Sequence, residues 1–517
     1  MPVSPTYPGV YIEEIPSGVR TIAGVATSIT AFLGRAIRGP IDEPISIFNF
    51  GDFERYFGGL DVDHPMSYAI RDFFGNGGGQ AIVVRLYKEE TEGVDGCARI
   101  TYETLNLVAS NPGTWGDNLT LSVNWDGINN DVGDRYDIDP VKLFNLVITD
   151  LTTGTTETIS NVTYLDSTRR VDRVLKQSSI LVLMDGVIPT VTDRPSETKD
   201  VHGKVIQLSF TGGVDSDALG PDEYKGSQND KTGMYALAKT DLFNLLCIPP
   251  DTRDGYIDKD IYSDALAYCR DRRAMLIVDP PSMWSDSSMV NLDDIGLTGE
   301  DARNAAVFFP RVKVSDPCRE NQIEIFVPCG IVAGIMARTD TQRGVWKAPA
   351  GIDAAINGIQ GLSVNLTDDE NGKLNPLGVN CFRSFPVYGK VLWGSRTLRG
   401  ADQLADEYKY IPVRRLALYI EESLYRGTKW VVFEPNDEPL WAQIRLNVGA
   451  FMNSLFRKGA FQGTTAKDAY MVKCDKETTT QNDINLGIVN ILVGFAPLKP
   501  AEFVIIKIQQ LAGQIQS

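Results

Sequence analysis

A glycine-rich run is the first feature of this chain whose residue types could do chemistry, because such loops cradle phosphate groups. The run is Gly-Asn-Gly-Gly-Gly at residues 75–79. Phosphate loops follow a strand and open a helix. Here the order is reversed, since residues 67–74 have a helical pattern and residues 81–86 that of a strand. The run is therefore predicted to connect a helix to a strand, with glycines at positive φ.

Metal ions find few ligands in this sequence. The acidic stretch Thr-Asp-Asp-Glu-Asn-Gly at residues 367–372 lacks the alternate ligands and the closing glutamate of an EF-hand, so we expect a solvated turn there. Only two histidines are present, His64 and His202. Most zinc sites and most proton-transfer catalysis depend on imidazole. The sequence predicts neither a metal site nor a cofactor.

Nucleophilic catalysis needs an activated side chain, and the sequence contains no motif that would supply one. It contains no Gly-x-Ser-x-Gly elbow, no Walker loop and no His-Glu-x-x-His. Its seven cysteines are odd in number and include no Cys-x-x-Cys pair. This usage predicts free buried thiols rather than a disulfide framework. No catalytic residue is predicted.

Charge is unevenly distributed along the chain. The net charge of −17 disfavours non-specific nucleic-acid binding. Residues 341–517 hold 20 Lys or Arg and 17 Asp or Glu, whereas residues 1–340 hold 30 and 50. We expect an acidic, solvated exterior and a slightly basic part that faces an acidic partner. No apolar run is long enough to span a membrane, and prolines occupy positions 2, 5 and 8, so we expect synthesis in the cytoplasm without membrane association.

Short apolar strands alternate with helices in two parts of the chain, which is typical of an α/β sheet covered on both faces. The predicted strands cover residues 29–33, 81–86, 242–248, 274–278 and 305–309, and the predicted helices residues 52–57, 67–74 and 258–271. Between these parts lie short alternating runs rich in Thr, Asn, Gly and Asp, which predict an inserted β-rich domain. The expected division is an N-terminal arm (1–22), a discontinuous α/β domain (23–90 and 235–340), the insertion (91–234), a C-terminal α+β domain (341–499) and a C-terminal arm (500–517).

Two amphipathic helices are predicted in the C-terminal domain. Residues 413–425 and 439–458 each place apolar side chains on one helical face. Pro439 suits a first helical turn, and Gly459 suits a C-cap. Six basic side chains lie beside the two stripes, namely Arg414, Arg415, Arg426, Arg445, Arg457 and Lys458. They form either ordinary surface charge or a basic face held against an acidic partner.

Both ends of the chain have the pattern of strands without a neighbour. Residues 8–16 are bounded by prolines, and residues 500–508 are a β-branched run that begins with proline. A lone strand leaves backbone groups unpaired, so it must join a sheet of its own chain or of a neighbour. The side chains predicted to make these contacts are Val10, Tyr11, Ile12, Ile15, Phe503, Val504, Ile505, Ile506 and Ile508.

Several motifs resemble those of contractile tail sheath proteins. The N-terminal matches are Tyr-Pro-Gly-Val-Tyr-Ile-Glu-Glu at 7–14, Ala-Phe-Leu-Gly at 31–34 and Asn-Pro-Gly-Thr-Trp-Gly-Asp-Asn-Leu at 111–119. The C-terminal matches are Val-Trp-Lys-Ala-Pro-Ala-Gly at 345–351, Trp-Gly-Ser-Arg-Thr-Leu at 393–398, Phe-Glu-Pro-Asn at 433–436, Gly-Ala-Phe-Gln-Gly at 459–463 and Pro-Ala-Glu-Phe at 500–503. The matches span most of the chain, but residues 125–235 contribute little.

The resemblance implies a mechanical, non-enzymatic role. Sheath subunits of this family stack as six-membered rings around an inner tube, and their terminal arms add strands to neighbouring subunits. On triggering at the baseplate, the cylinder shortens and drives the tube through a target envelope. The implied partners are further copies of the chain, the inner tube protein, and baseplate and cap proteins, within a phage tail or a phage-tail-like particle that can leave the cell. Arg445, Arg457 and Lys458 would then contact the tube.

Two other classes remain open from the residues alone. One is an α/β oxidoreductase or hydrolase with a β-rich lid, which requires a strand-to-helix glycine loop or a nucleophile with its base. The other is a different self-assembling surface polymer, such as a surface-layer or adhesin subunit.

Overall fold

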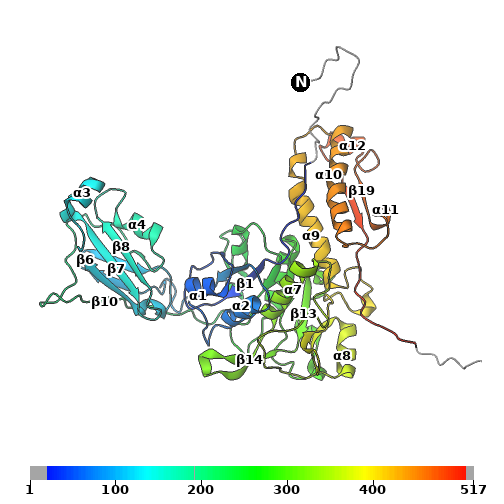
Figure 1. Cartoon of the computed structure of the whole chain (residues 1–517), viewed down its shortest axis with the longest axis horizontal. Coiled ribbons are helices and arrows are strands. Elements are labelled where there is room, and N and C mark those ends of the chain that lie inside the picture. The colour runs from blue at the N-terminus through cyan, green and yellow to red at the C-terminus, as the bar shows by residue number, and fades with distance from the viewer. Residues whose placement is uncertain (1–19, 191–192, 508–517) are drawn as a thin grey trace, which may run out of the picture.

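The computed structural model of the protein describes residues 20–190 and 193–507. They form an elongated molecule with a β-rich domain at one end, an α/β body in the middle and a helical domain that rises from the body (Figure 1). The chain is thus of mixed α/β type with several sheets, as predicted. No helix of the described residues is long and apolar enough to cross a lipid bilayer.

An eight-stranded sheet forms the centre of the α/β body. Its strands lie in the order β18-β17-β13-β12-β11-β1-β3-β2. Neighbours pair in parallel, except that the outermost strands β18 and β2 run antiparallel to theirs. The strands are β1 (Thr30–Gly34), β2 (Ile45–Ile47), β3 (Ala81–Arg85), β11 (Leu245–Cys247), β12 (Met275–Val278), β13 (Ala305–Phe309), β17 (Val379–Phe385) and β18 (Gly389–Leu392).

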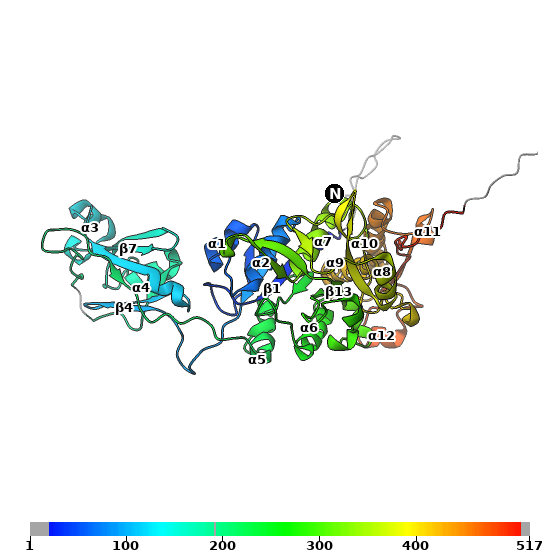
Figure 2. The ribbon, with the colours of Figure 1, turned by 90° about the horizontal axis from the view of Figure 1, so that it is seen from below.

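Helices cover both faces of this sheet (Figure 2). Successive strand residues point to opposite faces, so Phe32 and Val83 pack into one core and Leu33 and Val84 into the other. The first core is covered by α1 (Phe50–Phe57), α2 (Pro65–Gly75) and α7 (Cys329–Arg343), and the second by α5 (Pro221–Lys225) and α6 (Lys259–Asp271). Burial on both faces explains why the strands are uninterrupted apolar runs.

The glycine run connects α2 to β3, as predicted. Gly77 has a φ of +107°, which a residue with a Cβ rarely adopts. A Cβ at this position would also lie 2.8 Å from the Arg338 side chain of α7. The glycines thus serve a tight crossing between helix and strand.

The central sheet extends past the domain boundary expected at residue 341. Residues 379–392 supply β17 and β18, and β17 pairs in parallel with β13. Val379 and Cys381 pack into one core while Phe382 packs into the other. A short apolar run of this kind does not show in the sequence which sheet it will join, because its partner lies far away in the chain.

The inserted domain consists of two antiparallel sheets around one core. Their strand orders are β4-β5-β9 and β10-β6-β7-β8, and Leu107 of the first sheet shares the core with Leu121 and Phe144 of the second. The elements are β4 (Arg99–Tyr102), β5 (Leu105–Ala109), β6 (Leu119–Asn124), α3 (Asn130–Tyr136), β7 (Phe144–Asp150), β8 (Thr156–Val162), α4 (Val171–Ser178), β9 (Val182–Met184) and β10 (Leu208–Ser209).

Buried arginines attach this domain to the body. Arg38 pairs with Asp150 at 3.0 Å, and the exposed fractions of the two side chains are 9% and 3%. Arg85, at the end of β3, donates to the backbone carbonyl oxygens of Gly39 and Pro112. Both contacts join residues before the insertion to residues within it.

A third small sheet lies on the body, and a helix replaces the turn expected at residues 367–372. The sheet consists of β14 (Val312–Asp316), β15 (Gln322–Phe326) and β16 (Gly361–Leu362). The acidic stretch begins α8 (Asp368–Leu374). The Thr367 hydroxyl accepts from the Glu370 N–H, and the Glu370 carboxylate accepts from the Thr367 N–H, so the predicted turn is wrong because the stretch forms a capping box.

The helical domain is built from two long helices and a hairpin. Its elements are α9 (Ile411–Gly427), α10 (Glu438–Arg457), α11 (Ala466–Ala469), β19 (Tyr470–Lys473), α12 (Gln481–Asn485) and β20 (Leu492–Phe495). The predicted apolar stripes of α9 and α10 meet in one core that includes Leu416, Ile420, Trp441 and Val448. The two predicted helices are thereby confirmed.

Residues 20–27 form a strap along α9. Ile22 packs into the helical-domain core, and the Val25 N–H donates to the Ser423 hydroxyl. At the end of the strap, Thr27 reaches an ion pair between Arg415 of α9 and Asp340 of α7, whose nitrogen–oxygen distances are 2.9 and 2.6 Å. The Thr27 hydroxyl donates to Asp340 and the Thr27 carbonyl accepts from Arg415. The Arg415 and Asp340 side chains are 3% and 4% exposed, so the pair joins the helical domain to the body within the protein interior.

We expect Asp340→Asn to destabilise the junction between the body and the helical domain. It leaves the buried Arg415 guanidinium without a counter-charge, a change that costs about 3 kcal/mol or more in comparable buried pairs. Urea unfolding followed by tryptophan fluorescence measures this loss, since Trp441 lies in the helical-domain core and Trp346 and Trp430 pack against it.

The matched control is Asp353→Asn. Asp353 lies 3.8 Å from Arg343, and both side chains are more than half exposed. Exposed pairs contribute about 0–1 kcal/mol, so this change should leave the unfolding curve nearly unaltered. Equal effects of the two substitutions would contradict the role given to the buried pair.

Candidate functional site

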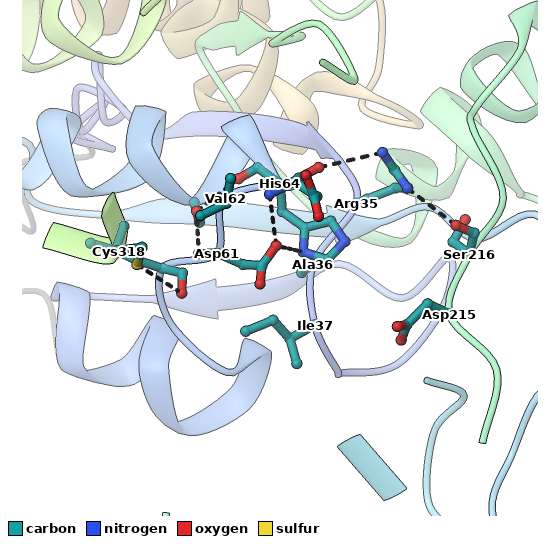
Figure 3. Close-up of polar contacts among 12 residues, drawn as sticks. Arg35, Ala36, Ile37, Asp61, Val62, His64, Asp215, Ser216 and Cys318 are labelled. Atoms are coloured by element: carbon teal, nitrogen blue, oxygen red, sulfur yellow. Dashed lines mark hydrogen bonds and ion pairs between the residues drawn. The ribbon is translucent and has the colours of Figure 1, made fainter. Parts of the chain in front are cut away.

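The carboxyl edge of the central sheet is where α/β proteins usually bind ligands. Arg35 follows β1 at this edge and pairs with Asp251, which follows β11. The Arg35 guanidinium also donates to the backbone carbonyls of Ser216 and Asp63 (Figure 3). Arg35 thereby ties three loops to one another across the edge.

The two kinds of side chain that could form a nucleophile and its base lie near this edge but do not meet. His64 Nδ1 lies 3.0 Å from Asp61 Oδ1, and this hydrogen bond lowers the pKa of the Asp61 carboxyl. The Cys318 thiol contacts the Leu60 carbonyl oxygen at 3.7 Å rather than an imidazole (Figure 3). The histidine and the cysteine therefore act on separate partners.

Asp279 is the most perturbed carboxyl at this edge. It follows β12, its Oδ1 accepts from the Cys329 N–H at 2.9 Å, and its Oδ2 has no hydrogen-bond partner among the described residues. Burial raises the pKa of Asp279 to about 7, because Cys329 and Arg311 compensate only in part. Such a group can transfer protons at neutral pH. Its neighbours Tyr262, Cys329 and Arg311 are themselves buried, so the carboxyl belongs to the packed interior.

The described part of the chain contains no cluster of metal-binding side chains and no disulfide bond. There, no three His, Cys, Asp or Glu side chains come together as a metal site would need. The seven cysteines are all free, and five are buried as predicted. Cys318 is exposed and Cys97 is partly exposed, so the prediction of buried thiols is wrong for these two.

The hairpin of the helical domain offers open strand edges. β19 and β20 pair antiparallel, with Tyr470 opposite Phe495 and Lys473 opposite Leu492, and form a sheet of two strands. Among the described residues, no third strand joins either edge. A two-stranded sheet is at best marginally stable unless it packs against other elements or gains strands. Met471 and Leu492 are 45% and 49% exposed, so apolar surface accompanies the unpaired backbone.

The C-terminal run carries its apolar side chains into solvent. Four consecutive residues, Phe503 to Ile506, have exposed fractions between 71% and 81%. They form no strand within the described chain and leave the molecule beside the body, below the helical domain in the view of Figure 1. The N-terminal contact residues Val10, Tyr11, Ile12 and Ile15, and Ile508 at the other end, lie outside the described residues.

The basic side chains of the helical domain divide into two groups. Arg457 and Lys458 are exposed at the end of α10. Arg445 is partly buried, pairs with Glu438 and donates to the Cys474 carbonyl. Arg445 is thus already engaged within its own domain, whereas Arg457 and Lys458 remain accessible.

The sequence did not reveal β19, although that strand supplies one open edge. Its four residues, Tyr-Met-Val-Lys, follow α11 directly and are too few to show alternation clearly. The signal that could have found it is the apolar run at residues 488–495, which contains β20, because an exposed strand needs at least one partner.

Two family models match this chain. The model of the phage tail sheath protein central domain matches residues 232–398, and that of the phage tail sheath C-terminal domain matches residues 405–510. The first ends just after β18, in agreement with the extent of the central sheet. The chain belongs to the phage tail sheath family.

Individual relatives agree with this assignment. The tail sheath protein of Vibrio phage KVP40 is 29% identical over 174 residues, which are 34% of this chain and 24% of that protein. The chain thus matches about a quarter of the length of that relative. The tail sheath protein of Burkholderia phage BcepMu is 23% identical over 482 residues, covering 89% of this chain and 88% of its own.

A solved sheath shares the fold. The PVC sheath complex of an extracellular contractile injection system, in its contracted state, superposes with a TM-score of 0.58 at 21% identity. The superposition covers 98% of each chain. The body, the inserted domain and the helical domain therefore all lie within the shared fold.

We expect Asp279→Asn to increase the free energy of unfolding at neutral and higher pH. In the wild type, the folded-state pKa of about 7 exceeds the ordinary value of 3.8, so stability falls as pH rises between these values. Asparagine keeps the acceptor for the Cys329 N–H but cannot ionise. The difference between variant and wild type should grow with pH up to about 7, by at most about 4 kcal/mol at 1.36 kcal/mol per unit of pKa.

Asp61→Asn serves as a control, because its effect on the free energy of unfolding should have the opposite sign. The pKa of Asp61 is lowered, so its contribution is present above the ordinary value of 3.8 and is lost as pH falls. This variant should be less stable than wild type at neutral pH. A pH-independent effect of Asp279→Asn would contradict the raised pKa.

Proposed function

We propose that the protein is the structural subunit of a contractile sheath, polymerised as stacked hexameric rings around an inner tube. Contraction of the polymer drives the tube through a target envelope. The single observation that supports this proposal most directly is the combination of open strand edges on β19–β20 with an exposed apolar terminal run on the same chain. An edge and a strand that have no partner within one chain can satisfy each other between copies.

The free energy gained by adding one strand is moderate, which suits a polymer held together by many such strands. An added strand that forms about five backbone hydrogen bonds gains about 1 kcal/mol net for each. A buried anchor such as Phe503 adds about 2 kcal/mol. Ordering a free arm offsets much of this gain. A single link is then weak, and a continuous lattice depends on several links for every subunit.

The end of α10 is the proposed contact with the inner tube. Arg457 and Lys458 are exposed there, and Leu446 on the same helix is 50% exposed. Leu446 lies about three helical turns before Arg457, so the two accessible cations and the apolar side chain suit an extended surface that is acidic and partly apolar. Arg445 would act indirectly, by fixing the start of α10 to the loop after β19 through Glu438 and Cys474.

Membership of the sheath family also argues against the alternative that the chain is an α/β enzyme. An oxidoreductase or hydrolase would need a substrate site at the carboxyl edge of the central sheet. There charged groups pair with one another, as in Arg35 with Asp251 and Asp316 with Arg253, and the unpaired Asp279 Oδ2 lies in the packed interior. We therefore assign the chain a mechanical role within a phage tail or a phage-tail-like particle, with baseplate and cap proteins as further partners.

Deletion of residues 1–16 should yield a folded, soluble monomer that forms no long cylinders. The strap contacts of the described residues, from Arg20 onward, remain in this variant, so the body and the helical domain keep their junction. Negative-stain microscopy of the purified full chain and of the deletion variant measures cylinder length. Cylinders of normal length from the deletion variant would contradict the proposal that the N-terminal arm links neighbouring subunits.

The double change Arg457→Glu and Lys458→Glu should abolish co-sedimentation with inner tubes while sheath polymers without a tube still form. The matched control is Lys176→Glu with Lys204→Glu, which reverses two exposed cations on the inserted domain. Unchanged co-sedimentation of the first variant would contradict the tube contact. Loss of co-sedimentation in the control as well would show that only net charge matters.

A further inference from the structure

The C-terminal run touches the rest of the protein at few points. It leaves the helical domain after β20 and passes along the body before it departs (Figure 1). In the segment from Leu498 to Lys507, only Pro500 and Glu502 are not exposed. The run is therefore held on the body mainly through Glu502.

Three side chains clasp the Glu502 carboxylate. Arg396 donates from Nε and Nη2 to the two carboxylate oxygens, at 2.7 Å each. The Asn375 amide donates to Oε1 at 2.7 Å, and the Tyr410 hydroxyl donates to Oε2 at 2.9 Å. A bidentate pair of arginine and carboxylate fixes both distance and direction.

The clasp lies mostly out of solvent. The Arg396 side chain is 0% exposed and that of Glu502 is 19% exposed. Burial by itself raises the pKa of Glu502, but Arg396 and Asn375 outweigh that effect and hold the pKa below its ordinary value. The carboxylate is therefore ionised and paired at neutral pH.

Arg396 is in turn bound to the central sheet. Its backbone N–H donates to Asn380 Oδ1 at 2.6 Å, and the Asn380 amide donates to the Val307 carbonyl at 3.0 Å. Asn380 belongs to β17 and Val307 to β13. A continuous path of hydrogen bonds thus leads from Glu502 into two strands of the α/β body, without passing through α9, α10 or the hairpin.

We propose that Glu502 is the positioning residue of the C-terminal arm: it anchors the arm on the α/β body, so that the strand from Phe503 onward leaves each subunit at a fixed point. Tension on that strand then passes into the central sheet. Without the anchor, the arm would be held only as far as Ala496 and Pro497, which bond to residues 461, 462 and 469, and residues 498–502 would join the flexible tether. A longer flexible tether lowers the effective concentration of the strand at a neighbour's edge.

The inference rests on the proposed function and is tested on the full chain. Glu502→Ala should fold normally, because no described residue after Phe495 packs into a hydrophobic core and Arg396 keeps Asp402 and the Gly400 carbonyl as partners. The critical concentration for cylinder formation, measured by sedimentation, should rise at least tenfold. Glu407→Gln removes one charge from an exposed glutamate near Tyr410 and should leave the critical concentration unchanged.

A double-variant cycle separates anchoring from a general loss of stability. Asn375→Ala should raise the critical concentration about threefold. Because both residues act through one clasp, Asn375→Ala combined with Glu502→Ala should be no worse than Glu502→Ala alone. Effects that multiply to about thirtyfold would overturn the proposal, because they would show independent actions.

The outcomes also distinguish the anchor from the sheath function. If the unaltered chain forms no cylinders, the proposed function fails and the anchor fails with it. If the unaltered chain forms cylinders and Glu502→Ala forms them at the same concentration, only the anchor is refuted.

Discussion

The buried ion pair between Arg415 and Asp340 is the contact on which the arrangement of the other parts depends. It joins α9 of the helical domain to α7 of the body, and Thr27 brings the N-terminal strap to the same point. Isolated charges are unfavourable in a protein interior, so each partner holds the other in place. The two domains and the strap therefore meet at one buried contact with strict geometry. Further bonds between α9 and the body, such as Arg414 with Asn304 and Glu422 with Arg273, reinforce it.

Arginine is used in the same way at two further junctions. Arg38 holds the inserted domain through Asp150, and Arg396 holds the C-terminal run through Glu502. In each case a planar guanidinium with several donors binds a carboxylate from a distant part of the chain. The polar groups at the carboxyl edge of the sheet, such as Arg35 and Asp251, likewise bind each other. The ion pairs of this molecule thus hold its domains and terminal segments together.

Besides these fixed junctions, the described chain has strand edges and a terminal run whose backbone groups lack a partner strand. Within the described chain, the hairpin β19–β20 ends in open edges, and the run from Phe503 to Ile506 has no strand to pair with. A rigid body with open edges and projecting apolar runs suits a subunit that completes its sheets with neighbouring copies. The proposed sheath role follows from this combination, and the Glu502 clasp would mark where the rigid body ends and the exchanged strand begins.

The sequence by itself determined the local elements and the family. Alternating apolar runs and helical stripes located β1, β3, β12, α6, α9 and α10, because burial on one or two faces leaves a periodic pattern. It did not determine that β17 joins the central sheet, that residues 367–372 form a capped helix start, or that Arg415 lies inside the protein rather than on a basic face. Those features depend on partners far away in the chain, and a charged side chain looks the same in a sequence whether it meets water or a buried carboxylate. Only the tertiary structure supplies the partner, and with it the difference between a surface charge and a junction.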